Sequence, residues 1–381
     1  MNNDRVKVLT NIYLLRLDEM MAGKEDPRRR WRAAAACVRA WDPDAEDFGA
    51  MFREAMSAAA QYLQPVQEEE VSCPVDGILA LCDAGRGEEV REAFASLTEE
   101  VDIASRQDQT RAFVRRINEL LEEALPGEWR YRQRFRDGIG YLSFIRPAEN
   151  YLYRAPETAL FAGYTEAEEE IGYEKSFSLA AFYRFCNEIS LYLMSRKDVQ
   201  QAVTGVLTDA SVTQEDLSEL DPEMHLLTAD LMHSAYVFQF YDDKAANRKS
   251  RISTAAQRRI DRARQQAKLL EQRDQVSGRL EEVAVRETGA GLPNLQGLEV
   301  QHKAFGVGTV TIHDGKYLTV VFPAKGTKKF ALPGVVVNGY LSFENADRIA
   351  AACGAMDRIV AERRRVADEL SAIDVQLRML E

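Results

Sequence analysis

The sequence has no long hydrophobic run of the kind that crosses a membrane. No stretch approaches the roughly 20 apolar residues that a bilayer-spanning helix needs. The opening MNNDRVKVLTNIYLL lacks the basic start, the apolar core and the small-residue cleavage site of a secretory signal. Cysteine is scarce as well: the five cysteines are scattered and form no Cys-x-x-Cys pair, which argues against disulfides and structural zinc. We therefore expect a cytoplasmic protein that does not bind membranes.

Sequence signatures of catalysis are missing too. The chain contains no G-x-x-x-x-G-K-[ST] loop, no G-x-S-x-G elbow, no H-E-x-x-H pair and no set of kinase motifs. His225 and His233 are two helical turns apart, whereas metal-binding pairs on a helix are usually one turn apart. We interpret them as structural histidines and expect no metal, no cofactor and no enzymatic activity. The alternative is a metal-dependent nuclease with its site within residues 126–241.

Basic residues are fewer than acidic ones: the chain has 49 Lys and Arg and 61 Asp and Glu, and its net charge is −12. This excludes a protein that coats nucleic acid with its whole surface. Local basic patches remain possible, because charges act within a Debye length of about 10 Å. Two groups oppose the overall sign: Arg130, Arg132, Arg134 and Arg136, and a segment with Lys244, Arg248, Lys249, Arg251, Arg258, Arg259, Arg262, Arg264 and Lys268. Each is either a phosphate-binding surface or a solvated face, and the first could instead pair with the acidic runs at 68–70 and 168–170.

Apolar residues at spacings of three and four fill the first 125 residues and predict a helical domain. The period changes at 129–136, where WRYRQRFR alternates aromatic residues with arginines. A period of two indicates a strand, and DGIG followed by YLSFI suggests a turn and a returning strand. Helices are expected again at 176–194 and within 223–241. Residues 126–241 are therefore predicted to form a mixed α/β domain.

Two long helices are predicted near the C-terminus, over 242–290 and 345–381. In the second, a seam follows alternating steps of three and four through Ile349, Ala352, Met356, Ile359, Arg363, Val366, Leu370, Ile373, Leu377 and Leu380. A heptad seam of this kind buries one stripe of a helix against another helix. We expect the two segments to pair as an antiparallel hairpin, with Arg363 opposite Asp274. A coiled-coil homodimer is the rival arrangement.

Between these helices, residues 296–343 have the pattern of a small β-module. Asp314-Gly315 separates two alternating strands and Lys325-Gly326 separates a further pair, as is typical of hairpins. In the stretch HKAFGVGTV, Gly306 and Gly308 lie between strands and no helix follows them, so they do not form a phosphate-binding loop. We expect them to permit a positive φ or a bulge at the corner of a small barrel.

Five positions of this module, His302, Phe305, Gly306, Gly308 and Val310, are followed by an apolar strand and then by Lys328, Lys329 and Phe330. In this pattern residues 297–343 resemble the Tudor- or SH3-like module at the C-terminus of UvrD/PcrA-type helicases, which is related to the RNA-polymerase-interaction domain of CarD and Mfd. The resemblance implies a barrel that docks on RNA polymerase or on nucleic acid, with Lys325, Lys328 and Lys329 among its binding residues. It covers about an eighth of the chain. The helicase motor motif is absent, so helicase activity is not implied.

The sequence thus predicts a multidomain, mainly α-helical protein. A helical N-terminal region leads to a mixed α/β middle domain and then to a long antiparallel coiled-coil hairpin with an inserted SH3/Tudor-like β-barrel. The expected function is that of a non-enzymatic bacterial adaptor. It would bind nucleic acid, or the machinery that transcribes, repairs or defends it, through the barrel and the basic helix. The alternatives are the nuclease named above and a purely structural coiled-coil oligomer.

Overall fold

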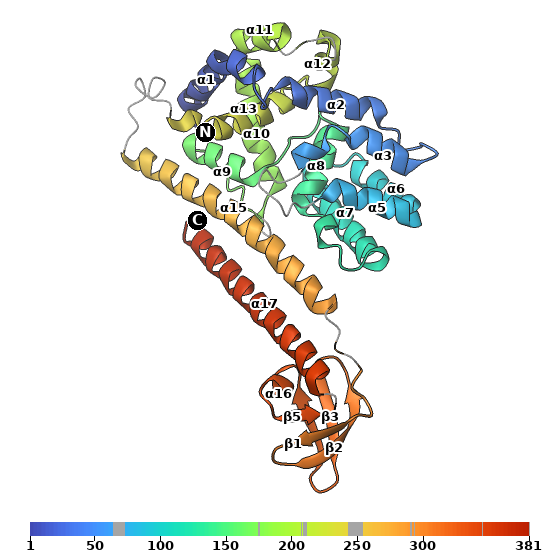
Figure 1. Cartoon of the computed structure of the whole chain (residues 1–381). Coiled ribbons are helices and arrows are strands. Elements are labelled where there is room, and N and C mark those ends of the chain that lie inside the picture. Colours follow the sequence, from blue (N-terminus) through green and yellow to red (C-terminus); the bar gives the residue numbers. More distant parts are fainter. Residues whose placement is uncertain are drawn as a thin grey trace. The chain divides into compact units, whose positions relative to one another are not determined.

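The computed structural model describes residues 1–63, 73–173, 176–206, 208, 212–242, 254–289, 292, 294–344 and 346–380. The chain is mainly helical and has one five-stranded antiparallel sheet. It divides into two compact units: Met1–Gln272 with Leu377–Glu381, here the helical unit, and Arg273–Gln376, here the sheet unit. Figure 1 shows helices α1 to α13 gathered in the first and the strands in the second. Within the described ranges, no helix is long and apolar enough to cross a bilayer.

The helical unit is built around one apolar core. Its helices are α1 (Asn3–Met21), α2 (Arg28–Ala40), α3 (Phe48–Met56), α4 (Ala60–Leu63), α5 (Pro74–Leu81), α6 (Gly87–Thr98), α7 (Ile103–Ala124), α8 (Phe135–Ile145), α9 (Ala155–Tyr164), α10 (Leu179–Met194), α11 (Lys197–Val206), α12 (Gln214–Leu220), α13 (His225–Val237) and the first half of α15 (Thr254–Gly289). One cluster of buried side chains extends from Leu9 to Ala267. The helical character predicted for the first 125 residues is confirmed. The helices predicted at 176–194 and within 223–241 are α10 and α13.

The strand hairpin predicted at 129–146 is wrong, and so is the mixed α/β character of 126–241. Trp129–Tyr131 form a single 3-10 turn, α8 follows, and the described residues of 126–241 contain no β-strand. A carboxylate fixes the start of α8, because the backbone N–H of Arg134 donates to Asp137 at 2.6 Å. Every residue of α8 from Asp137 to Ile145 is buried. A helix buried on all sides shows no helical periodicity, so its apolar run cannot be told from a strand by pattern.

Helix α15 packs against the helical unit through a close contact with α9. Ile260, Ala263 and Ala267 are buried on one side of α15. A Cβ placed on Gly163 of α9 would lie only 2.1 Å from the Cβ of Ala263. Glycine at position 163 therefore lets the two helices approach more closely than any other residue would permit, as small residues do at helix crossings.

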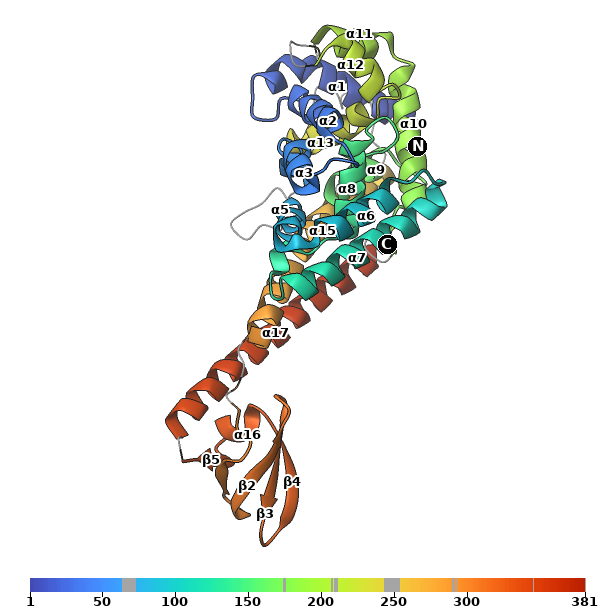
Figure 2. The ribbon, with the colours of Figure 1, turned by 90° about the vertical axis from the view of Figure 1, so that its right-hand side faces the viewer.

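The sheet unit contains five antiparallel strands in the order β4-β3-β2-β1-β5. They are β1 (Glu299–His302), β2 (Gly306–His313), β3 (Tyr317–Phe322), β4 (Gly326–Ala331) and β5 (Leu341–Phe343), with the short helix α16 (Gly334–Val337) before β5. Figure 2 shows β2, β3 and β4 side by side. Both predicted hairpins are present, and Gly315 and Gly326 take positive φ values of 81° and 70° at their turns. Strands β4 and β5 are the two edges, so the described strands form an open sheet and not the closed barrel that was predicted.

The two glycines of HKAFGVGTV have different roles. Gly306 has a φ of 78° and open space around it, so its backbone conformation is what favours glycine. A Cβ on Gly308 would lie 2.6 Å from the ring of Phe322, so the absence of a side chain lets that ring pack against β2. A strand follows both glycines, as predicted, and the register shift lies slightly later, between Val310 and Ile312.

Helix α17 (Ala346–Leu380) contributes to two different packing arrangements. Near its start, Ile349 and Cys353 are buried in the apolar cluster of the sheet. Further along, its seam residues Val366 and Ile373 are buried as well. Ion pairs join this part of α17 to α15: Arg273 with Asp374 at 2.7 Å, Arg279 with Glu369 at 2.5 Å, Arg286 with Glu362 at 2.5 Å, and Arg363 with Glu287 at 2.6 Å. Within the sheet unit the two helices therefore run antiparallel.

The predicted partner of Arg363 is wrong, because Arg363 pairs with Glu287 and not with Asp274. An antiparallel pairing with Arg363 opposite Asp274 would place Ile349, fourteen residues earlier, beside the end of α15. Ile349 packs on the sheet instead. The first turns of α17 therefore do not pair with α15, and the register between the two helices is shifted by several turns.

A bifunctional thiol crosslinker tests this register. In a background with the half-buried Cys73 and Cys82 changed to serine, we expect Arg279→Cys and Glu369→Cys to crosslink within one chain, because these side chains meet across the helices. Mass spectrometry of the digested product identifies the link. Asp274→Cys with Arg363→Cys is the matched control and should react far less. A better yield from the control pair, or links found only between chains, would contradict the register.

Candidate nucleic-acid and partner interface

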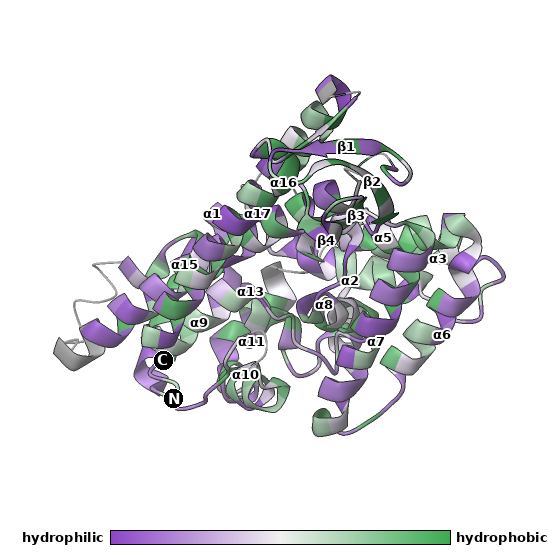
Figure 3. Cartoon of the chain, turned by 90° about the horizontal axis from the view of Figure 1, so that it is seen from below, coloured by the Kyte–Doolittle hydropathy of each residue, from purple (hydrophilic) through white to green (hydrophobic). Residues whose placement is uncertain are grey.

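The basic residues predicted on the second-last helix lie on the outward side of α15. Arg258, Arg259, Arg262 and Lys268 are exposed, whereas Ile260, Ala263 and Ala267 face the core of the helical unit. The helix forms because its apolar residues recur at steps of three and four, which gives it one buried stripe. Figure 3 shows polar and apolar residues interleaved along the helices. Lys244, Arg248, Lys249 and Arg251 lie outside the described residues.

Most of the basic residues of this part of α15 form no ion pair within the described part of the chain. Arg264 pairs with Asp242 and is half-buried. Arg258, Arg259, Arg262 and Lys268 form no ion pair with any residue that the structure describes. In a chain with a net charge of −12, four unpaired cations on one helix form a local surface of opposite sign.

The arginines at 130–136 do not form the single face that was predicted. Arg130 and Arg132 are exposed on the 3-10 turn and just after it, while Arg134 precedes α8 and Arg136 lies 3.8 Å from Asp137. The segment is held instead by the buried Gln133, whose side-chain amide donates to the carbonyl oxygens of Pro74 and Tyr131.

Of the two acidic runs that could pair with these arginines, the structure describes the one at 168–170. In the run at 168–170, Glu169 pairs with Arg184 at 2.7 Å. The run at 68–70 lies outside the described residues. The four arginines therefore sit in different local settings, and we do not assign them to one surface.

The predicted motif of the sheet unit divides into core and surface residues. Val310 is buried, and Gly308 provides space for the Phe322 ring. His302 and Phe305 are half-buried and stack with ring centres 4.2 Å apart. Phe330 extends this group, since its ring centre lies 5.3 Å from that of His302. The motif thus combines a packing requirement with a partly exposed aromatic cluster.

Lysines accompany these aromatic rings. Lys325, Lys328 and Lys329 are all exposed on the β3–β4 turn and on β4. The Nζ of Lys328 lies 5.9 Å from the ring centre of Phe305, and that of Lys329 lies 4.2 Å from the ring centre of Tyr317. Cations beside aromatic faces suit the stacking of bases and the binding of acidic partners.

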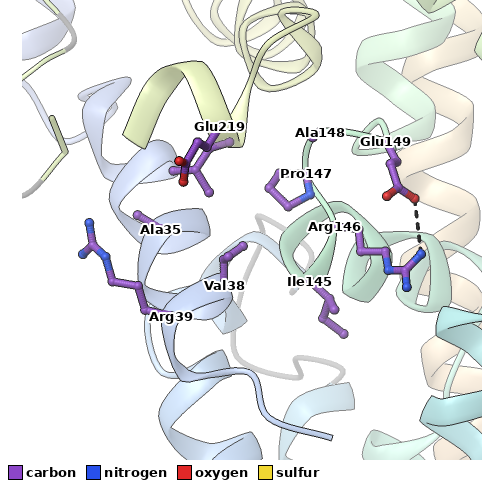
Figure 4. A pocket seen from close by; sticks show the side chains of 10 residues that line it. Ala35, Val38, Arg39, Ile145, Arg146, Pro147, Ala148, Glu149 and Glu219 are labelled. Atoms are coloured by element: carbon purple, nitrogen blue, oxygen red, sulfur yellow. Dashed lines mark hydrogen bonds and ion pairs between the residues drawn. The ribbon is translucent and has the colours of Figure 1, made fainter. Parts of the chain in front are cut away.

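A hollow in the helical unit lies where the nuclease alternative would place its site (Figure 4). Its volume is about 250 Å³, and α2, α12 and the loop after α8 line it. Two carboxylates reach it, but Glu149 is 3.4 Å from Arg146, and Glu219 comes from the other side of the hollow. Across the described ranges, no group of three or more His, Cys, Asp and Glu is placed to hold a metal ion.

The two histidines interpreted as structural are both buried in α13. His225 stacks on Tyr151 with ring centres 4.0 Å apart. His233 lies between two carboxylates: its Nδ1 is 2.9 Å from Glu157, and its Nε2 is 3.0 Å from Glu25. Burial opposes the charged imidazolium, but these carboxylates outweigh it and raise the pKa of His233.

The raised pKa of His233 predicts a loss of stability as pH rises. A histidine with a folded-state pKa above its unfolded value of about 6.5 stabilises fully below that value, and the contribution is lost as pH rises through the folded pKa. We expect the free energy of unfolding to fall as pH rises above about 6.5. Denaturant titrations across this range should show a flatter profile for His233→Gln. Parallel profiles for the two proteins would contradict the assignment.

Next to His233, a buried ion pair escaped the sequence interpretation. Arg30 of α2 pairs with Asp230 of α13, and the Tyr13 hydroxyl donates to the same carboxylate at 2.7 Å. Both charged side chains are 3% exposed. No local pattern could reveal this pair, because its members are far apart in the sequence and meet only through helix packing.

Comparison with protein-family models, with curated proteins and with solved structures finds no match to this chain.

Proposed function

We propose that this chain is a non-enzymatic adaptor that binds nucleic acid through the first half of α15. The observation that carries the proposal is the set of exposed, unpaired cations Arg258, Arg259, Arg262 and Lys268 in a chain with a net charge of −12. If this helix face only contacted solvent, carboxylates four residues away from its cations would stabilise the helix through i to i+4 ion pairs. Among the described basic residues from Arg258 to Lys268, Arg264 is the one with a carboxylate partner from another described element.

The spacing of these cations suits a phosphate backbone. At a rise of 1.5 Å per residue, the helix from Arg258 to Lys268 is about 15 Å long. Duplex DNA presents one charge per roughly 1.7 Å of axis, so about nine phosphate charges lie within that length. Four neutralised phosphates give a slope of about −3.6 for log affinity against log salt. Binding is then expected to weaken roughly a hundredfold between about 50 and 200 mM salt.

We further propose that the sheet unit carries an open SH3/Tudor-like module that docks on the machinery acting on nucleic acid, such as RNA polymerase. Supporting this are the five short antiparallel strands, the His302–Phe305 stack and the exposed Lys328 beside it. We do not propose the homodimer. The seam residues Val366 and Ile373, which a dimer would use, are already buried within one chain.

Charge reversal on α15 tests the nucleic-acid proposal. We expect Arg258→Glu, Arg259→Glu and Arg262→Glu together to lower affinity for a short fluorescent duplex by about a hundredfold or more at ~50 mM salt. Fluorescence anisotropy measures the affinity, and circular dichroism confirms that helicity is kept. The matched control reverses Arg111, Arg115 and Arg116, which are exposed on α7. Equal binding by the α15 variant and the wild type, or an equal loss in the control, would refute the proposal.

A further inference from the structure

A polar cavity lies in the helical unit where the loop before α2 meets α13. Its volume is about 280 Å³, and its wall includes Lys24, Arg29, Arg30, Tyr62, Arg154 and His233. The lining residues come from four separate parts of the chain, so the cavity exists only in the folded unit. No basic residue of α15 lines it, so the cavity is distinct from the surface proposed above.

The carboxylates at this cavity already have cationic partners. Asp26 is held by Arg28 at 2.9 Å, Glu25 by His233 at 3.0 Å, and Asp230 by Arg30. Lys24 and Arg29, in contrast, are exposed and form no ion pair with any described residue. Arg29 donates only to the backbone carbonyl of Lys24, at 3.0 Å. The cavity wall therefore combines carboxylates that have cationic partners with two cations that form no ion pair among the described residues.

Arg30 supplies a buried donor that the fold leaves without an acceptor. Its side chain is 3% exposed, and one terminal nitrogen bonds to Asp230. The guanidinium carbon lies 5.3 Å from the ring centre of Tyr62, which fixes the plane of the group. The Nε has no hydrogen-bond partner in the described part of the chain. A buried charged donor without an acceptor is unfavourable, and a planar guanidinium matches the oxygens of an oxyanion.

We propose that this cavity binds the phosphate group of a small molecule. The Nε of Arg30 and the side chains of Lys24 and Arg29 are its donors. A phosphate carries about two negative charges near neutral pH, which suits two unpaired cations better than a carboxylate does. Ligand pockets usually enclose roughly 300–1,000 Å³, so this cavity, at about 280 Å³, is slightly smaller than that range. The cavity can hold a phosphate group attached to a small organic molecule, but it is too small for a nucleic-acid strand.

Thermal unfolding in the presence of phosphate tests the proposal. A ligand that binds only the folded state raises the melting temperature in proportion to the logarithm of its concentration. We expect inorganic phosphate, but not chloride at equal ionic strength, to raise the melting temperature of the wild type. Lys24→Ala with Arg29→Ala should weaken binding about tenfold or more, since each removes one charge-assisted contact. Lys7→Ala with Arg115→Ala, two exposed cations of the same unit, should bind as the wild type does.

A second probe separates the sources of the phosphate. Tighter binding of AMP than of inorganic phosphate identifies a phosphate ester as the ligand, and the reverse order identifies free phosphate. Arg30→Lys, which keeps the charge beside Asp230 but not the Nε donor, should also bind less phosphate if it remains folded. No stabilisation by either probe at about 10 mM, or undiminished stabilisation of the Lys24 and Arg29 variant, overturns the proposal. Nucleic-acid binding by α15 should be unchanged in that variant, so the two proposals can fail separately.

Discussion

Replacing Gly308 by valine is expected to unfold the sheet unit. A Cβ at this position would lie 2.6 Å from the Phe322 ring and 2.8 Å from Val320, and both of these residues are fully buried. Because both neighbours belong to the core, neither side chain can turn away into solvent. Overpacking of a core costs about 1–3 kcal/mol in well-buried sites and more where the obstacle is rigid. Small modules have little stability to lose.

Hydrogen exchange followed by mass spectrometry measures this effect. In Gly308→Val, peptides from β2 and β3 should lose their protection, while peptides from α7 and α8 keep theirs. Thr309→Val is the matched control, because Thr309 is the exposed neighbour on the same strand. Unchanged protection of β3 in the Gly308 variant would show that the strand can move away from Phe322 at little cost.

Asp230→Ala is expected to destabilise the helical unit by about 3–5 kcal/mol, the usual cost of breaking a buried ion pair on one side. The change leaves the guanidinium of Arg30 buried without its carboxylate and removes the acceptor of the Tyr13 hydroxyl. The stability is lost because the buried charge of Arg30 no longer has a partner. It is not a measure of how much the intact ion pair stabilises the fold. Changing both members, Arg30→Met with Asp230→Leu, should therefore recover much of the stability.

Denaturant unfolding followed by the fluorescence of the buried Trp31 gives the required free energies. A double-mutant cycle then isolates the coupling between the two side chains. Asp83→Ala serves as the control, since its pair with Arg53 spans 3.5 Å and is exposed, and we expect a change within about 0.5 kcal/mol. If the Arg30→Met, Asp230→Leu variant is as unstable as Asp230→Ala, the destabilisation comes from lost packing and the charge argument is refuted.

Local sequence patterns predicted those parts of the fold that depend on interactions between residues close together in the sequence. The Asp314-Gly315 turn, the seam of α17 and the helix at 176–194 all follow from spacing and turn chemistry, and the structure contains each of them. Helix α8 was missed because it is buried on every side and has no polar face to reveal its period. The capping carboxylate of Asp137, three residues after Arg134, was the one local signal that favoured a helix there.

Longer-range features were not accessible from the sequence. The register of α15 against α17 depends on which turns of α17 the sheet covers, and that depends on the packing of Ile349. The basic residues of α15 could be identified because they stand out from an acidic chain. The phosphate cavity could not, because Lys24, Arg30 and His233 meet only when α13 packs beside α2.

Helix α17 packs both on the sheet and against α15, and this affects the order in which the two units fold during synthesis. When the ribosome has added Phe343, all five strands exist, but Ile349 and Cys353 have yet to be made. Until then the apolar cluster that contains Val300, Val320 and Phe322 lacks these two members. Among the described residues, the main apolar cluster of the helical unit ends at Ala267 and can form earlier. During synthesis the helical unit is therefore expected to fold first, and the nascent strands must wait for the helix that follows them.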